Sequence, residues 1–432
     1  MTNIFYLGII YLVFSFFLFL YGIKSYNNSL KSYLYSIALN VFPLILSGYL
    51  GESKTRFFRI PIAYFPIIAG IMSSIVLSKF RLLKRYKTLY VLYMILISYL
   101  FLQSFVFVGV KHLDSFLEYY LMWVVNIYAM FVVSYVVVKI PYEILLSILK
   151  NLVLLIVICA FVGIFKYIIG IQYDANFMPM MNRNGTVFLV VLTIPILLLI
   201  RDLGLIKPSS FLVCLLIYIL NILFIKSRMG ILGFIFSYLI YYLFKYKFKL
   251  HILIPSVIIF MGLILAFLYS PIGNYLLYKL EMTVASIRMI VTSGEISPGM
   301  SDYRRFQLLV GAVEIIKSNL LFGTGVGLGN YLEKLNVNVI PAKAHNFYLS
   351  YLAEFGIIGF SILIIFLIVL WSFFRKIPDK NFYITFQTIF LSVIFMFTMN
   401  EYITFPLLWV IWGIGLGLSG KNRYSGESNY AL

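Results

Sequence analysis

The chain has 432 residues, of which 62% are hydrophobic, 19% are aromatic and only 11% are charged. This balance differs from that of a soluble domain and predicts a polytopic membrane protein. The net charge of +19 invites comparison with nucleic-acid-binding proteins, but the basic residues lie in short loops between apolar segments, so we exclude a nucleic-acid partner.

The apolar segments have the length of membrane-spanning helices, each of which needs about 20 residues. Their continuously apolar character excludes a β-barrel, whose strands alternate apolar and polar residues. The first segment has no basic start and no small-residue cleavage site, so we expect it to be retained. In chain order the expected spans are 4–22, 33–50, 60–78, 88–110, 116–138, 146–170, 185–200, 209–225, 229–244, 251–270, 345–374, 382–399 and 402–419.

The predicted fold class is therefore all-α, a polytopic bundle of about 12 or 13 transmembrane helices in a single membrane domain over residues 1–432. Short basic loops stay on the cytoplasmic side, and loop 79–87 is the most basic. Strict alternation then brings further basic loops to the same side, namely 139–143, 201–208, 245–249 and 375–380. The same alternation places Lys54, Arg56 and Arg59 outside, so the alternatives are that one N-terminal span is miscounted or that 382–419 is a broken pair around Asn400 and Glu401.

The stretch 271–344 is predicted to be a long extracytoplasmic loop. Apolar residues recur at helical spacing from Tyr303 to Leu321, with Asp302 as the expected N-cap, so we expect a helix lying across the outer surface. A glycine run that includes Gly323 and Gly325 then interrupts the helix.

Basic and titratable residues recur where spans or the surface helix meet the outer boundary. A bundle can gather them around one cavity, and several arginines there favour a ligand that carries phosphate or pyrophosphate. The residues concerned are Arg183, Arg228, Arg304, Arg305, and His345 with Asn346.

Each of these features also has a structural interpretation. An arginine at the end of a span commonly reaches toward lipid headgroups, and His345 with Asn346 can simply begin a helix. The glycine run lacks the spacing and the strand-helix setting of a nucleotide loop, so it can be a turn or a site of close packing. Glu354 lies inside an apolar segment, where a carboxylate is costly unless it is paired or functional.

Taken together, these residues resemble the O-antigen ligase and polymerase superfamily (WaaL and Wzy). The resemblance is concentrated in residues 180–360. It is carried by Ser227-Arg228-x-Gly230, Arg305 at the start of a surface helix, Phe322-Gly323-x-Gly325-x-Gly327, His345-Asn346-x-Tyr348 and Glu354-x-Gly356.

The resemblance implies an inverting, metal-independent glycosyltransferase without a cofactor. Its donor would be an oligosaccharide linked to undecaprenyl pyrophosphate. Catalytic roles would fall to Arg228, Arg305 and His345, with the arginines on the pyrophosphate and the histidine on the acceptor hydroxyl. Substrate-binding positions would be Arg183, Arg304, Asn346, Tyr348, Gly323, Gly325 and Glu354, with Glu354 treated as a supporting residue rather than the base.

The resemblance further implies a multi-pass protein of the bacterial inner (cytoplasmic) membrane, with its active site on the periplasmic or outer face. Membrane lipids and a polysaccharide chain-length regulator would be its partners. We favour a polymerase, which extends lipid-linked repeat units, because the outer loop is modest and tyrosine-rich. One alternative is an O-antigen ligase, which transfers glycan to lipid A core. The other is a flippase or other transporter of lipid-linked oligosaccharide. Internal repeats would favour a transporter, and the two halves of the sequence do not resemble each other.

Overall fold

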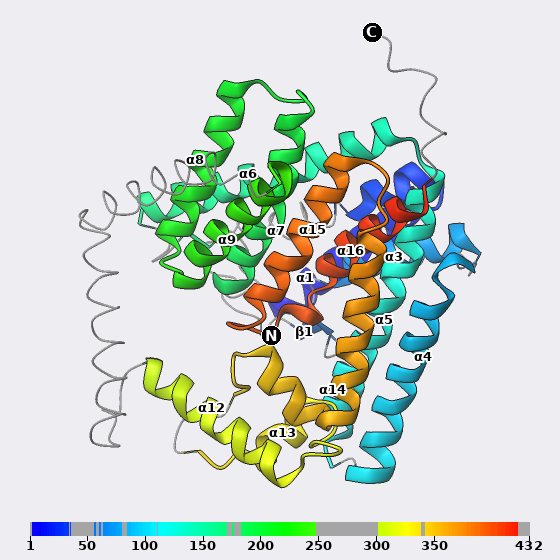
Figure 1. The fold of residues 1–432 in the computed structure, drawn as a ribbon, viewed down its shortest axis with the longest axis vertical. Coiled ribbons are helices and arrows are strands. Elements are labelled where there is room, and N and C mark those ends of the chain that lie inside the picture. The colour runs from blue at the N-terminus through cyan, green and yellow to red at the C-terminus, as the bar shows by residue number, and fades with distance from the viewer. Residues whose placement is uncertain are drawn as a thin grey trace.

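The computed structural model describes residues 2–33, 35, 56–57, 60–61, 64–79, 84–109, 111–170, 175–176, 183–247, 301–337 and 342–421. Within these ranges the chain is a bundle of helices (Figure 1) with one small antiparallel ladder, in which Arg56 faces Pro61. The elements are α1 (Thr2–Gly22), β1 (Arg56–Phe57), β2 (Ile60–Pro61), α3 (Tyr64–Ser78), η1 (Lys84–Tyr86), α4 (Lys87–Leu102), the π-helix η2 (Gln103–Val108), α5 (Leu113–Lys139), α6 (Tyr142–Ile168), α7 (Arg183–Asp202), α8 (Pro208–Phe224), α9 (Arg228–Lys245), α12 (Ser301–Ser318), α13 (Leu328–Lys334), α14 (Phe347–Phe374), α15 (Lys380–Met396), η3 (Tyr402–Thr404) and α16 (Pro406–Gly420).

The predicted all-α fold class is confirmed. A helix occupies each expected span that falls in the described residues, with its ends shifted by a few positions. Segment 251–270 and nearly all of 33–50 lie outside those residues. Five of the described helices are long and apolar enough to cross a membrane, and five other apolar helices are shorter. The total number of spans therefore stays a prediction.

Helix α16 lies at the centre of the bundle and is buried along its whole length up to Ser419. It packs against α5 through small residues four positions apart. A Cβ atom added to Gly413 would lie 2.7 Å from the Met130 carbonyl oxygen, and one added to Gly417 would lie 2.8 Å from that of Ser134. Glycines at this spacing allow two helix backbones to approach closely, as is common between helices in membranes.

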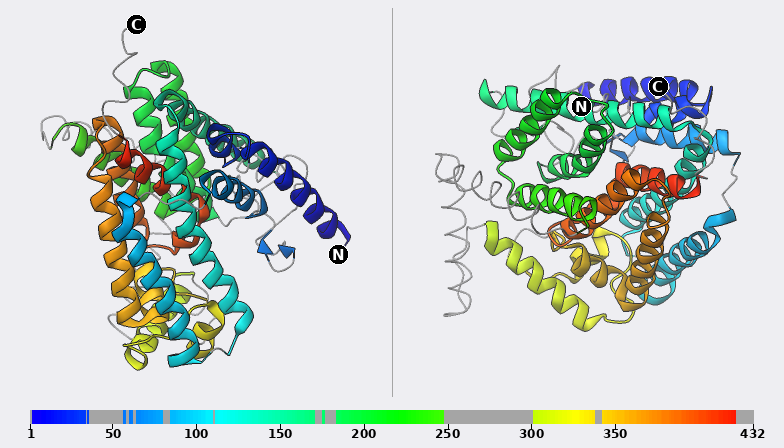
Figure 2. Two further views of the ribbon diagram at one scale, coloured as in Figure 1. Left: turned by 90° about the vertical axis from the view of Figure 1, so that its right-hand side faces the viewer. Right: turned by 45° about the horizontal axis from the view of Figure 1, so that its top comes forward.

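Helices α4, α5 and the second part of α14 stand side by side in Figures 1 and 2. The expected single span 345–374 is wrong in one respect, because Gly356 breaks α14 with backbone angles of φ 63° and ψ 179°. The break frees backbone groups, and the Tyr99 hydroxyl of α4 donates to the Phe355 carbonyl at 3.0 Å. Glycine permits this positive φ without steric cost.

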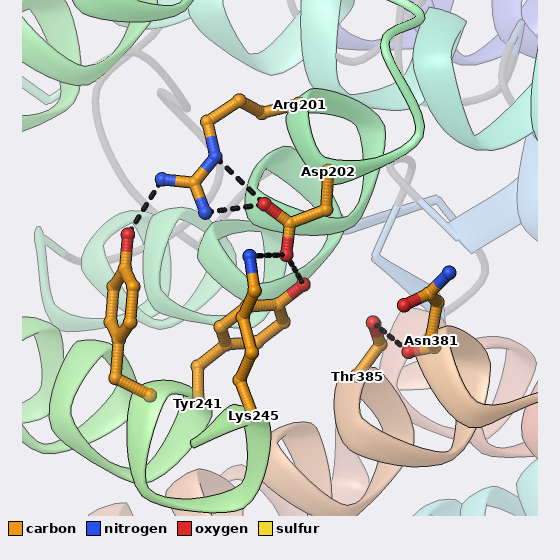
Figure 3. A network of polar contacts seen from close by, with 7 residues as sticks. Arg201, Asp202, Tyr241, Lys245, Asn381 and Thr385 are labelled. Carbon is orange, nitrogen blue, oxygen red and sulfur yellow. Dashed lines mark hydrogen bonds and ion pairs between the residues drawn. The ribbon is translucent and has the colours of Figure 1, made fainter.

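One end of the bundle gathers the basic connections that alternation predicts to share a side. Asp202 ends α7 there and accepts hydrogen bonds from Arg201, from Lys245 at 2.6 Å and from the Tyr241 hydroxyl at 2.8 Å (Figure 3). The Lys421 ammonium donates to the carbonyl of Ile140. We call this the basic end, defined by Lys139, Lys245, Arg375 and Lys421.

The opposite end carries α12 and α13, with α12 lying across the bundle (Figure 1). The expected surface helix is thus present, but it begins at Ser301, so Asp302 lies in its first turn and not at its N-cap. A second, short helix, α13, was not expected. Both belong to the described part of the predicted outer loop, 271–344.

The connection between α15 and α16 lies inside the bundle, because both helices are short. Helix α15 starts at the basic end and has 17 residues, and α16 returns there with 15. At 1.5 Å per residue they reach about 25 Å and about 22 Å, less than the roughly 30 Å of a bilayer core. Residues 397–405, which join them, therefore lie within the bundle, and we call them the recessed connection. The broken pair considered for 382–419 matches this arrangement.

Candidate functional site

The segment that precedes α14 is fastened to the recessed connection. Asn346 caps α14, because its side-chain oxygen accepts the Leu349 N–H at 3.0 Å. Its amide nitrogen donates to the Thr398 carbonyl at 2.9 Å, and the Phe347 N–H donates to the Phe397 carbonyl at 2.9 Å. The two segments therefore form one unit, joined by one backbone–backbone hydrogen bond and by the one that the Asn346 side chain donates.

His345 occupies a constrained position in this unit. Its backbone is left-handed, with φ of 52°, which is uncommon for a non-glycine residue and is found preferentially at functional sites. Burial and the nearby charges of Arg305 and Arg304 lower the pKa of the imidazole, and a hydrogen bond with Asn400 opposes this shift. The imidazole is thus neutral near pH 7 and able to accept a proton.

The starts of α7 and α9 meet the same connection. The Tyr402 ring stacks on Phe188 of α7 with ring centroids 4.2 Å apart, and its hydroxyl lies 3.5 Å from the sulfur of Met229 in α9. The Ser227 hydroxyl, which also caps α9, donates to the Asn184 side chain at 3.4 Å. Because Arg183 opens α7 and Arg228 opens α9, both arginine positions lie beside the recessed connection.

Four helix N-termini therefore converge on this place: α7, α9 and α14, with α16 following directly after the recessed connection. Each N-terminus carries a partial positive charge, although Ser227 and Asn346 already cap α9 and α14. Arg305 adds a full positive charge close enough to affect both His345 and Tyr402. The arrangement is electropositive and suited to an anionic ligand.

A buried ion cluster lies next to the backbone of His345. The Lys343 ammonium is 2.8 Å from Glu354 Oε1 and 3.8 Å from Glu401 Oε2, and it also lies over the rings of Tyr119 and Tyr351 at 4.6 and 5.0 Å. The Lys343 and Glu354 side chains are only 7% and 1% exposed, so neither charge is compensated by water.

The cluster is connected to His345 through Glu401. This carboxylate accepts the backbone N–H of His345 and the hydroxyl of Ser350. Burial raises the pKa of Glu401 to about 7, although Lys343 lowers it. Burial would lower the pKa of Lys343, but the neighbouring carboxylates raise it well above its usual value. One lysine thus balances one ionised carboxylate while the second holds a proton for part of the time.

The glycine run packs against the break in α14. Thr324 N–H donates to the Ala353 carbonyl at 2.9 Å, Gly325 N–H to the Glu354 carbonyl at 3.0 Å, and Ile357 N–H to the Leu320 carbonyl at 2.8 Å. The Gln103 side chain of η2 reinforces this contact by donating to the Glu354 carbonyl at 2.6 Å. Backbone groups freed by Gly356 are therefore satisfied by this run, which we call the glycine loop, residues 320–327.

The predicted site residues separate into two groups. His345, Asn346, Arg304 and Arg305 meet at the recessed connection, together with the helix starts at Arg183 and Arg228. Tyr348 lies beside them, with its hydroxyl donating to the Ile394 carbonyl at 3.0 Å.

The second group supports the first. Glu354 is the ion-pair partner of Lys343, and Gly323 and Gly325 carry the backbone contacts of the glycine loop. A direct contact of these three residues with a substrate stays a prediction.

Sequence reasoning missed Lys343 and Asn400 and left Glu401 without a role. Lys343 stands two positions before His345 in a stretch without helical periodicity, so no spacing predicted that it would turn into the bundle. Among the described residues no group of three or more histidine, cysteine or acidic side chains is arranged to hold a metal ion. Metal independence itself stays a prediction.

A family model matches part of the chain. Residues 213–364 match the family model described as O-Antigen ligase. The matched stretch runs from α8 through the break in α14 and contains Arg228, Arg305, the glycine loop, His345 and Glu354. No curated protein matches the chain.

Proposed function

From the match of residues 213–364 to the O-Antigen ligase family model, we propose that the chain is a member of the Wzy/WaaL-like superfamily and that it polymerises oligosaccharide repeat units carried on undecaprenyl pyrophosphate. The superfamily acts in surface glycan synthesis by glycosyl transfer. The proposed product is O-antigen or another surface polysaccharide. In this proposal the protein lies in a bacterial inner membrane, its site opens to the outer face, and a chain-length regulator is a partner.

The observation that carries the proposal is the convergence of four helix N-termini, Arg305 and His345 on the recessed connection. A pyrophosphate there would meet N–H groups, arginines and a low local dielectric, all of which favour its negative charge. The lowered pKa of His345 supports a base that is unprotonated near neutral pH.

The proposed reaction forms one bond and breaks another. The acceptor hydroxyl oxygen bonds to the anomeric carbon from the face opposite the pyrophosphate, and the bond between that carbon and the pyrophosphate oxygen breaks. Its electron pair leaves with the lipid pyrophosphate, while an imidazole nitrogen of His345 accepts the hydroxyl proton. Arg228 and Arg305, with Arg183, stabilise the charge that grows on the leaving group, so no metal or cofactor enters the scheme.

The polymerase and the ligase differ in their acceptor. A polymerase uses the non-reducing end of another lipid-linked repeat unit, and a ligase uses lipid A core. We prefer the polymerase because the outer loop 271–344 is modest in length and tyrosine-rich. The ligase is the second candidate, favoured by the description of the matched family.

The test uses the purified full chain in lipid nanodiscs, a native undecaprenyl-pyrophosphate repeat unit and a chelator. We expect a ladder of glycan lengths that His345→Ala abolishes and that Arg305→Ala reduces strongly to a low but measurable level, whereas Arg375→Ala, an exposed arginine at the basic end, leaves it unchanged. Transfer only after lipid A core is added would identify a ligase. Inactivity with both acceptors, combined with movement of the lipid between leaflets, would replace the enzyme with a transporter.

A further inference from the structure

A second concave site lies on the other face of the glycine loop. Its volume is about 580 Å³, within the range of small-molecule sites. The walls are the end of η2, the last turn of α12, the glycine loop and α13. His345, Arg304 and Arg305 do not line this cavity, so it is separate from the proposed catalytic site.

The inner wall of the cavity carries polar groups without a protein partner. Thr324 and Asn330 line it and are only 1% and 5% exposed. Within the described residues, neither the Thr324 hydroxyl nor either amide atom of Asn330 has a hydrogen-bond partner. Buried polar groups are almost always satisfied, and each exception is costly, so a ligand whose polar groups reach these atoms would be stabilised.

The rim of the cavity is positively charged. Lys111, Lys317 and Lys334 line it, and Glu333 is the one acidic side chain among the lining residues. Glu333 pairs with Lys111 at 2.5 Å, which leaves the exposed Lys317 and Lys334 to set the sign of the rim. Such a rim favours an anionic group on the ligand.

We infer that this cavity is a glycan subsite, which binds a sugar with an acidic substituent such as a carboxylate. Sugar hydroxyls would complete the hydrogen bonding of Thr324 and Asn330, and the acidic group would lie against Lys317 and Lys334. Leu320 and Phe322 would face the apolar side of the ring. A lipid fits less well, because its acyl chains cannot form hydrogen bonds with buried amide and hydroxyl groups.

The glycine loop connects the subsite to the segment that carries His345. The glycine loop forms its floor and is also hydrogen-bonded to the backbone of α14 at Ala353 and Glu354, and Glu354 is paired with Lys343. A sugar held here is therefore fixed relative to the His345 segment. This inference rests on the proposed function in that the bound molecule is part of a glycan acceptor or product.

The experiment measures binding directly and needs no catalytic turnover. Calorimetric titration of the full chain in nanodiscs would compare a glucuronate-containing tetrasaccharide with neutral chitotetraose. We expect the acidic probe to bind about tenfold more tightly, the scale of one charge-assisted hydrogen bond. The Lys317→Gln/Lys334→Gln double variant would remove this preference, and Lys380→Gln, an exposed lysine at the basic end, would retain it.

Two further measurements keep the inference falsifiable. Asn330→Asp, which keeps the shape of the side chain, should weaken both probes, and His345→Ala should bind both as the wild type does. Equal binding of the two probes, or unchanged binding in the lysine variant, would overturn the subsite. Loss of the glycan ladder in His345→Ala with unchanged probe binding would support both proposals, whereas an inactive wild type that still binds the acidic probe would contradict the polymerase alone.

Discussion

Gly323 and Gly356 lie backbone against backbone. A Cβ atom on Gly323 would collide with the Gly356 nitrogen, and one on Gly356 would come within 2.6 Å of the Gly323 nitrogen. Both residues have positive φ, at 68° and 63°. The glycine loop and the break in α14 therefore fit together only because neither position has a side chain, and the broken helix carries His345 at its start.

We predict that Gly323→Ala and Gly356→Ala strongly destabilise the protein. Each adds a steric clash with backbone atoms to the cost of a left-handed conformation, and we expect a loss of about 3 kcal/mol or more. Apparent melting temperatures from tryptophan fluorescence would measure it. Gly204→Ala is the matched control, because Gly204 has φ of 67° and open space within 4 Å of the position that a Cβ atom would take, so only the conformational cost of about 1 kcal/mol should remain.

Activity should depend on pH through His345. Because Arg305 contributes to the lowered pKa of the imidazole, Arg305→Gln should raise that pKa. The base would then become protonated at a higher pH, so the acid limb of the log kcat/KM profile should move toward higher pH. Arg304→Gln should move it in the same direction but less, and Lys380→Gln should not move it. An unchanged limb in Arg305→Gln would contradict the assignment of this limb to His345.

Removal of the buried lysine should be costly. Lys343→Met leaves the Glu354 and Glu401 carboxyls buried without their cation, and such changes cost about 3–5 kcal/mol. Adding Glu354→Gln should restore part of the stability, because the double variant no longer contains the uncompensated charge of Glu354. Lys376→Met, at an exposed lysine, is the control. Equal losses in the single and double variants would mean that the ion pair is not the cause.

Stability should also change with pH through Glu401, whose pKa is raised to about 7 in the folded protein. The unfolded chain releases this proton near pH ~4.3, so folding is favoured while the carboxyl stays protonated. The contribution is fully present below the unfolded pKa and is lost as the pH rises through about 7. Melting temperatures should therefore fall from about pH 5 to about pH 8, and Glu401→Gln should reduce this dependence.

At the basic end, Asp202→Asn should destabilise the junction of α7 and α9. The carboxylate has 8% exposure and is the shared acceptor of Arg201 and Lys245, which are both less than one-third exposed. We expect a loss of about 2 kcal/mol in a denaturant titration. Glu314→Gln, at an exposed carboxylate of α12, should change stability little.

Much of the fold could be predicted from local patterns. Continuous apolar runs gave the helices, and the surface helix followed from its periodicity, although Asp302 lies inside α12 and not at its cap. The broken helix at Gly356 was not predicted, because a glycine in a long apolar run is equally compatible with an unbroken helix. The break depends on the glycine loop, which supplies the hydrogen bonds that the helix gives up.

In the candidate site too, local sequence patterns predicted some residues, while others became apparent only from their tertiary contacts. Arginine and histidine at the ends of apolar segments identified Arg228, Arg305 and His345 as candidates, since such residues are costly in a membrane. Lys343 and Asn400 carried no comparable signal, because their importance comes from contacts with residues distant in the sequence.

The sequence by itself determined the all-α membrane class, the positions of most of the described helices, the motifs that resemble the superfamily and the set of candidate charges, because these depend on composition and short spacings. Only the tertiary structure decided that α15 and α16 are too short to carry Asn400 and Glu401 to the end of the bundle. It also decided that one buried lysine joins Glu354 to Glu401. The physical reason is that burial and pairing of charges are properties of the packed chain, in which helices from distant parts of the sequence exclude water together.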